Sequence, residues 1–179
     1  MDTGKLLTIN LTTEEIEWAD FPEALARRFL GGRGINDWLL AEHIGPGTDP
    51  LGPENILMLS CGLLTGTRVP SSSRLHVGAR SPLTGLLGSS NVGGHFRAGL
   101  RAAGVNTLLI QGHARRPVTL RIDDEMELRD ATHLWGLDSR TSSTWKGYST
   151  CATGPAGRTT TCRTASPRSA SATPAPPRG

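Results

Sequence analysis

The chain has 179 residues, enough for one ordinary domain with a core, or for such a domain with an unstructured end. Its formal net charge is +3, but all 16 acidic residues precede Ser139, whereas six of the 19 Lys and Arg residues follow it. Because the excess positive charge is confined to the C-terminal stretch, it does not predict a nucleic-acid-binding surface.

The sequence contains no segment that predicts export or a membrane anchor. Residues 1–5 lack a charged region followed by an apolar stretch, so they do not resemble a signal peptide. The longest aliphatic run covers only residues 56–59, far below the roughly 20 residues that span a bilayer. We therefore expect a soluble, cytoplasmic protein with no membrane partner.

The N-terminal third of the sequence predicts a β-hairpin, then two helices and a loop. Apolar side chains alternate within residues 5–18 on either side of a Thr-Thr-Glu turn, which is typical of a hairpin. Residues 22–31 begin with Pro and end with Gly, as a short helix does, and residues 35–42 follow a helical period. Between these helices, the Gly-Gly-Arg-Gly run at 31–34 fits a helix end and linker better than a phosphate contact.

The sequence from residue 56 to residue 129 predicts mainly short strands bounded by Gly, Pro or Asp. One helix, expected at about residues 95–103, interrupts them. Strands that follow one another with few helices predict an α+β domain and not alternating parallel units. The expected strands are residues 56–61, 74–80, 106–111, 118–122 and 126–129.

Residues 139–179 differ in composition from the body of the chain, residues 1–138. They contain no Leu, Ile, Val, Phe or Met, and Ser, Thr, Ala, Pro and Arg dominate. Such a segment buries too little apolar surface to offset the roughly 1–2 kcal/mol per residue that ordering the backbone costs. We predict a folded domain over residues 1–138 and a disordered tail over residues 139–179.

Residues 62–94 carry most of the features suited to binding a polar ligand. They contain two Leu-Thr-Gly turns, a Pro-Ser-Ser-Ser-Arg run at 70–74 and an Asn-Val-Gly-Gly run at 91–94. Glycines expose backbone N–H groups, serines are short donors, and an arginine fork suits a phosphate or a flat polar ring. The same residue types also build tight turns, so composition leaves both interpretations open.

No pattern of Cys or His predicts a zinc or iron–sulfur site. The three cysteines form no Cys-x-x-Cys pair, and Cys61, inside an expected strand, is interpreted as a small buried apolar residue. The histidines are dispersed without ligand-like spacing. We assign no metal to His76, His95, His113 or His133.

The order and spacing of the motifs resemble the first domain of the tungsten-containing aldehyde ferredoxin oxidoreductases, over about residues 4–138. Six motifs in register carry the resemblance. They are the Pro-rich stretch at 46–55, Leu-Thr-Gly-Thr at 64–67, Pro-Ser-Ser-Ser-Arg at 70–74, Ser-Pro-Leu-Thr-Gly at 81–85, Asn-Val-Gly-Gly at 91–94 and His-Leu-Trp-Gly at 133–136.

This resemblance implies a β-sheet saddle of mostly antiparallel strands beneath a tungsten bis-pyranopterin (tungstopterin). By position, Arg74, Asn91 and Gly93 would contact the cofactor. Arg74 would bond a pterin or its phosphate, and the Asn91 carbonyl would help bind a Mg²⁺ ion that bridges the two phosphates. Gly93 would let the backbone lie against the ring. The alternative is a surface ion pair of Arg74 and a plain turn at 91–94.

Two parts that the resemblance implies lie beyond the matched region. They are a second pterin-binding loop of the Arg-Ala-x-Gly-Arg-Gly-Gly type and the cysteines of a [4Fe–4S] cluster, which are absent here. The Gly-Pro-Ala-Gly run at 154–157 matches a family motif that continues into Glu-Asn, but Arg158 follows it. A one-base shift of suitable codons for residues 157–160 would restore Glu-Asn, so we predict that the reading frame shifts near Gly157.

The activity implied by the resemblance is oxidation of an aldehyde with water to a carboxylic acid, with electrons passing to ferredoxin through the cluster. This chain would supply part of the cofactor cradle, and we expect it to be inactive by itself. Alternatively, it is a non-catalytic remnant, or a separate pterin-carrying subunit that a downstream-encoded remainder completes. No nucleic-acid partner is expected, because no aromatic residues alternate with the arginines of the tail.

Overall fold

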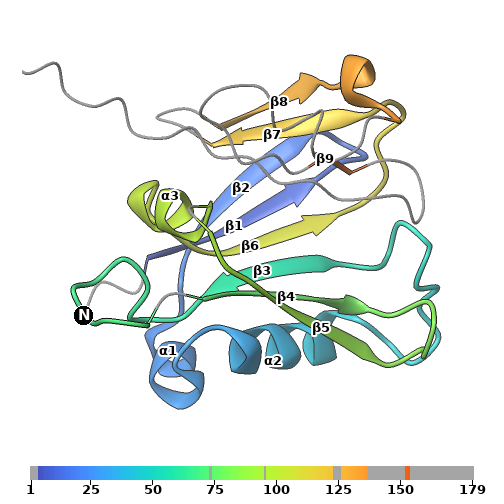
Figure 1. The fold of residues 1–179 in the computed structure, drawn as a ribbon. Coiled ribbons are helices and arrows are strands. Elements are labelled where there is room, and N and C mark those ends of the chain that lie inside the picture. Colours follow the sequence, from blue (N-terminus) through green and yellow to red (C-terminus); the bar gives the residue numbers. More distant parts are fainter. Residues whose placement is uncertain (1–3, 73, 95, 123–125, 137–151, 154–179) are drawn as a thin grey trace, which may run out of the picture.

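The computed structural model describes residues 4–72, 74–94, 96–122, 126–136 and 152–153, and the structural statements below concern these residues. They form a six-stranded sheet, a three-stranded sheet and four short helices (Figure 1). The strands are β1 (Lys5–Asn10), β2 (Glu15–Asp20), β3 (Leu57–Cys61), β4 (Leu75–Arg80), β5 (Leu87–Val92), β6 (Val105–Gln111), β7 (Val118–Ile122), β8 (Met126–Asp130) and β9 (Ala152–Thr153). The helices are α1 (Glu23–Phe29), α2 (Arg33–His43), α3 (Phe96–Ala102) and the 3₁₀ helix η1 (Thr132–Leu134).

The large sheet has the strand order β2-β1-β6-β3-β4-β5, and the small sheet has the order β8-β7-β9. All neighbouring strands pair antiparallel except β1 and β6, which are parallel. The predicted α+β class with a mostly antiparallel sheet is therefore confirmed. The predicted hairpin near the N-terminus is the β1–β2 pair, whose register ends at Asn10 opposite Glu15.

Two hydrophobic cores lie on opposite faces of the large sheet. On one face, Ala26 of α1 and Ile35 and Leu40 of α2 pack against Met58 and Leu109. The other face is covered by α3 and by β7 of the small sheet, and the buried residues there include Phe96, Leu100, Leu108, Val118 and Leu120. The large sheet is thus the middle layer, with α1 and α2 on one side and α3 and the small sheet on the other (Figure 1).

The junction between α1 and α2 explains the two glycines of the Gly-Gly-Arg-Gly run. The chain turns through left-handed backbone at Leu30 (φ 56°), Gly31 (φ 84°) and Gly32 (φ 60°), and α2 begins at Arg33. A Cβ atom at Gly31 would lie 2.6 Å from the carbonyl oxygen of Cys61. The fold itself therefore requires glycine there, which supports the interpretation of this run as a helix end, although α2 begins earlier than the sequence indicates.

Two segments depart from the sequence-based expectations. The strand β5 was not expected, because its residues Leu-Gly-Ser-Ser-Asn-Val contain few strand formers. Within the predicted tail, Ala152 and Thr153 form β9 and pair with Thr119 and Val118 of β7. The rest of residues 139–179, and His95, lie outside the described residues. In the described part of the chain, no helix has the length and apolarity needed to cross a membrane.

Candidate functional site

The structure brings Arg74, Asn91 and Gly93 together at one end of the β4–β5 pair. The last register pair of this ladder joins Leu75 to Val92, so Arg74 immediately precedes it and Gly93 immediately follows it. Asn91 lies opposite His76, one pair further along. All three residues are exposed. Arg74 therefore forms one exposed group with Asn91 and Gly93, although it is distant from them in the sequence.

The guanidinium group of Arg74 is available to a ligand. None of the described residues forms an ion pair or hydrogen bond with it, so the alternative of a surface ion pair finds no support in the described part of the chain. An exposed, unpaired arginine can make charge-assisted, bidentate hydrogen bonds to a phosphate.

A second arginine, Arg97 at the start of α3, lies beside the same segment. Its Nη1 atom donates a hydrogen bond to the carbonyl oxygen of Gly94. Its Nε atom is buried and has no hydrogen-bond partner among the described residues. Sequence reasoning did not select Arg97. The only available signal was its position three residues after the Gly-Gly pair, which α3 converts into proximity.

Gly93 and Gly94 differ in what the fold requires of them. A Cβ atom built at Gly93 meets nothing within 4 Å, and the backbone there is not in the left-handed region. Gly94 has φ +90°, a conformation that L residues rarely adopt. The fold thus explains glycine at 94, whereas at 93 the absence of a side chain only leaves space for something outside the described chain.

The side chains of Thr67 and Ser72 stabilise their own loop. Thr67 Oγ1 donates to the carbonyl oxygen of Leu64 at 2.7 Å, and Ser72 Oγ lies 3.0 Å from the same oxygen and 2.8 Å from that of Val69. These hydroxyls are not free donors for a ligand. For this part of the motif-rich window, the turn-building interpretation is the better one.

The second Leu-Thr-Gly turn, at 83–85, lies at the opposite end of β4 from Arg74. There, the guanidinium of Arg80 donates to the carbonyl oxygens of Gly85 (3.0 Å), Gly45 (2.8 Å) and Pro46 (2.7 Å). Arg80 therefore joins two loops and is not part of the Arg74 group. The window of residues 62–94 is divided between two ends of one strand pair.

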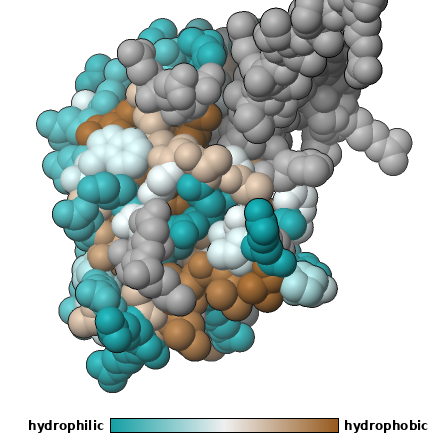
Figure 2. All heavy atoms as spheres, turned by 90° about the vertical axis from the view of Figure 1, so that its left-hand side faces the viewer, coloured by the Kyte–Doolittle hydropathy of each residue, from teal (hydrophilic) through white to brown (hydrophobic). Residues whose placement is uncertain are grey.

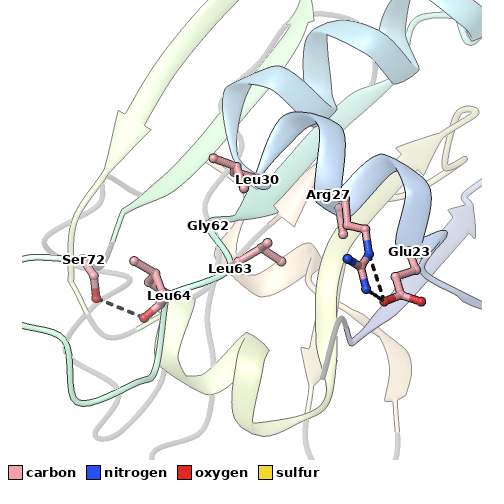
Figure 3. Close-up of a pocket in the computed structure, with 8 residues that line it drawn as sticks. Glu23, Arg27, Leu30, Gly62, Leu63, Leu64 and Ser72 are labelled. Atoms are coloured by element: carbon pink, nitrogen blue, oxygen red, sulfur yellow. Dashed lines mark hydrogen bonds and ion pairs between the residues drawn. The ribbon is translucent and has the colours of Figure 1, made fainter. Parts of the chain in front are cut away.

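An open pocket of about 700 Å³ lies between α1 and the loop that follows β3 (Figure 3). The side chains of Leu30, Leu63 and Leu64 make much of its lining apolar, and Ser72 lies at one side. The Glu23–Arg27 ion pair, 2.8 Å long, lies at the other side. Figure 2 shows an apolar area low on the face that α1 and α3 share.

Side-chain metal ligation is not supported anywhere in the described part of the chain. No three His, Cys, Asp or Glu residues gather there in a group that could hold a metal ion. Cys61 is buried, and burial raises the pKa of its thiol to about 12, against the lesser opposing effects of Arg101 and Arg97. The thiol stays protonated at neutral pH, which agrees with the interpretation of Cys61 as a small apolar residue. A metal at the Arg74 end would depend on backbone oxygens.

Comparison with known protein families identifies the family of this chain. The family described as the aldehyde ferredoxin oxidoreductase N-terminal domain matches residues 6–169 of the chain. The chain belongs to this family. The match extends beyond residue 138, where the motif-based resemblance to aldehyde ferredoxin oxidoreductases ended.

Curated relatives agree with this assignment. The chain is 42% identical over 134 residues to the tungsten-containing aldehyde ferredoxin oxidoreductase of Pyrococcus furiosus, and 43% identical to that of Thermococcus kodakarensis. Each match covers 74% of this chain and 22% of the relative. A Pyrococcus furiosus protein described as an aliphatic sulfonate oxidoreductase, WOR-like subunit, is 35% identical over 138 residues. The chain thus spans about a fifth of the length of these aldehyde ferredoxin oxidoreductases.

A solved structure supports the same fold. A chain in the active-site complex BamBC of benzoyl coenzyme A reductase, bound to 1,5-dienoyl-CoA, superposes with a TM-score of 0.77 at 34% sequence identity. The superposition covers 79% of this chain and 22% of that chain.

Proposed function

We propose that the Arg74 end of the β4–β5 pair is part of a cradle for a tungsten bis-pyranopterin. The observation that carries this proposal is the group formed by exposed Arg74, Asn91 and Gly93, in a chain whose curated relatives are named as tungsten-containing enzymes. The residues fit such a ligand. Among the described residues, Arg74 and the buried Nε atom of Arg97 have no partner, and no atom fills the space beside Gly93.

Each residue of this group has a separate role in the proposal. Arg74 and Arg97 supply positive charge for a pterin phosphate. Asn91 lies on an edge strand, where alternate carbonyl oxygens point away from the sheet, and its carbonyl is the proposed ligand of a Mg²⁺ ion that bridges two phosphates. Gly93 gives the flat ring close access to the backbone.

The reaction proposed for the complete enzyme is aldehyde plus water to carboxylic acid, two protons and two electrons. The electrons leave to ferredoxin through a [4Fe–4S] cluster whose ligands this chain does not contain. When bound, the tungsten cofactor supplies the two-electron redox chemistry, and the protein orients and shields it. We assign no general acid or base at the Arg74 end, so the role proposed for this chain is binding and orientation.

Cofactor analysis of the purified 179-residue chain tests the proposal. From cells grown with tungstate, we expect the wild-type chain to contain tungsten, Mg²⁺ and an oxidisable pterin. Arg74→Ala should lower the tungsten and pterin content roughly tenfold, because it removes a charge-assisted hydrogen bond. Arg115→Ala, an exposed arginine in the loop between β6 and β7, is the matched control and should leave both unchanged. Equal losses in the two variants, or a wild-type chain with no cofactor, would refute the cradle.

The alternative proposal is a pterin-carrying subunit or a non-catalytic remnant. Aldehyde-dependent reduction of a viologen dye separates the alternatives, because a cofactor-loaded chain without turnover is a carrier. Sequencing the locus tests the proposed frame shift near Gly157. The shift is excluded if the alternate frame meets stop codons and encodes neither an Arg-Gly-Gly loop nor cluster cysteines.

A further inference from the structure

A chain of hydrogen bonds between polar side chains crosses the α2 face of the large sheet. It runs from Thr107 on β6 through Ser60 on β3 to Asn36 on α2, and then to His76 on β4. Ser60 Oγ lies 3.0 Å from Thr107 Oγ1 and donates to Asn36 Oδ1, and Asn36 Nδ2 lies 2.9 Å from His76 Nδ1. All four residues are buried. This series of hydrogen bonds ends on the edge strand β5, where Ser89 Oγ lies 2.7 Å from His76 Nε2.

The partners of Asn36 determine the tautomer of His76. Asn36 Nδ2 lies 3.3 Å from the carbonyl oxygen of Met58 and 3.1 Å from that of His76, and only the N–H₂ end of an amide can face two carbonyl oxygens favourably. The two hydrogens of this group are shared among three acceptors, namely the two carbonyl oxygens and His76 Nδ1. A proton on Nδ1 would point at the N–H₂ group, so the geometry favours the neutral tautomer with its proton on Nε2, which then donates to Ser89 Oγ. Burial lowers the pKa of His76 below its ordinary value, which favours this form.

The strand β5 has few other attachments to the fold. It lies at the edge of the large sheet, pairs only with β4, and exposes every residue except Gly88, which is partly buried. Among the described residues, the Ser89–His76 contact is the only side-chain hydrogen bond that joins β5 to another element. Asn91 follows two residues later on the same face, opposite His76.

We propose that His76 and Ser89 are positioning residues for the Arg74 end of the sheet, because their hydrogen bond fixes β5, and with it Asn91 and Gly93, relative to β4. Asn36, Ser60 and Thr107 hold the imidazole ring from its buried side, so the anchor is itself rigid. The expected effect of this hydrogen bond on cofactor binding rests on the proposed function, whereas its expected effect on the stability of β5 is independent of that function.

Ser89→Ala is the informative variant, with Ser90→Ala as its matched control. Ser90 is the next residue of the same strand, is also exposed, and points to the opposite face, opposite Val77. Ser89→Thr keeps a hydroxyl and serves as the rescue variant. His76 itself is not replaced, because loss of its buried imidazole removes one of the acceptors of Asn36 and leaves a cavity, which destabilises the core for unrelated reasons.

Two measurements on these variants decide the proposal. Loss of one hydrogen bond should speed amide hydrogen exchange of β5 roughly three- to tenfold in Ser89→Ala, with no change in β6 and little change in the melting temperature. Tungsten content per chain should fall by a similar factor. Ser90→Ala should match the wild type in both measurements, and Ser89→Thr should restore them.

The outcomes separate this proposal from the proposed function. Equal exchange rates in Ser89→Ala and Ser90→Ala overturn the positioning role, whatever the cofactor content. Faster exchange in Ser89→Ala with wild-type tungsten content confines the role to the strand and overturns its link to the cofactor. Faster exchange in a protein whose wild-type chain binds no tungsten supports the anchor and refutes the cradle.

Discussion

Gly93 is a residue where requirements of the fold and of a ligand can be separated. Because a Cβ atom there meets nothing and φ is ordinary, we expect Gly93→Ala to leave the free energy of unfolding within about 0.5 kcal/mol of the wild type. Tungsten and pterin content should nevertheless fall, since the methyl group occupies the space proposed for the ring.

The neighbouring glycine provides the control for Gly93. Gly94→Ala forces alanine into a backbone with φ +90° and should cost about 1 kcal/mol or more. Urea denaturation and metal analysis of both variants check these expectations. If Gly93→Ala keeps its full cofactor content, Gly93 is not a contact and the carried-over assignment is wrong at this position.

Cys61 should be unreactive in the folded protein. With its pKa raised to about 12 by burial, the thiolate population at pH 8 is very small, and the thiolate is the reactive form. In a Cys151→Ser, Cys162→Ser background, we expect reaction with a disulfide reagent to be at least about a hundredfold slower than in urea. A native rate close to that of the unfolded chain would show that the thiol is accessible or activated.

The site residues were predictable from the sequence to different degrees. Arg74, Asn91 and Gly93 follow from the register of the motifs, and the structure brings these three together, although their contacts with a cofactor remain a prediction. Arg97 and His76 were not selected, because their relevance depends on a helix start and on a strand pairing that no local pattern encodes. Ser and Thr residues that bind a ligand cannot be told from those that stabilise a turn by sequence alone, because only their hydrogen-bond partners distinguish them.

At the scale of elements, the end of α1 contains a strained residue. Leu30 has φ 56° and is 68% exposed. Its left-handed backbone is therefore destabilising, and its side chain buries too little apolar surface to offset this. We expect Leu30→Gly to raise the free energy of unfolding by about 0.5–1 kcal/mol, as glycine does at left-handed helix ends.

The matched control for Leu30 lies on the same helix. Ala24 is an exposed position inside α1, where the change to Gly should lower the free energy of unfolding by about 1 kcal/mol. Urea denaturation measures both variants. If the two substitutions destabilise the protein equally, the backbone at Leu30 is not strained.

The elements that the sequence predicts well are those with a strong local pattern. The hairpin β1–β2, the helices α1 and α2, and the apolar strands β3, β6 and β7 all carry one. The strand β5 does not, because its polar residues lie on an edge and gain their structure from β4. The parallel pairing of β1 with β6 joins residues 5–10 to residues 105–111, and no local pattern encodes a contact of that range.

At the scale of the whole molecule, the described cores lie entirely within the N-terminal part of the chain. The buried hydrophobic residues extend from Leu7 to Ala131, and the only described element after residue 136 is β9. The family match nevertheless continues to residue 169. A domain boundary at residue 138 is therefore a prediction about stability, which truncation can test.

Removing residues 154–179 should leave the free energy of unfolding within about 0.5 kcal/mol of the full chain, because these residues include no Leu, Ile, Val, Phe or Met that could add to a core. Removing residues 137–179 also deletes β9 and exposes the edge of β7 at Val118 and Thr119, with an expected loss of about 1 kcal/mol. For comparison, Leu120→Ala, a core substitution on β7, should lower the free energy of unfolding by about 2–5 kcal/mol. Urea denaturation followed by circular dichroism compares the three variants with the full chain. A loss on removal of residues 154–179 as large as that of Leu120→Ala would place part of the tail in the folded domain, and the predicted boundary at residue 138 would then be wrong.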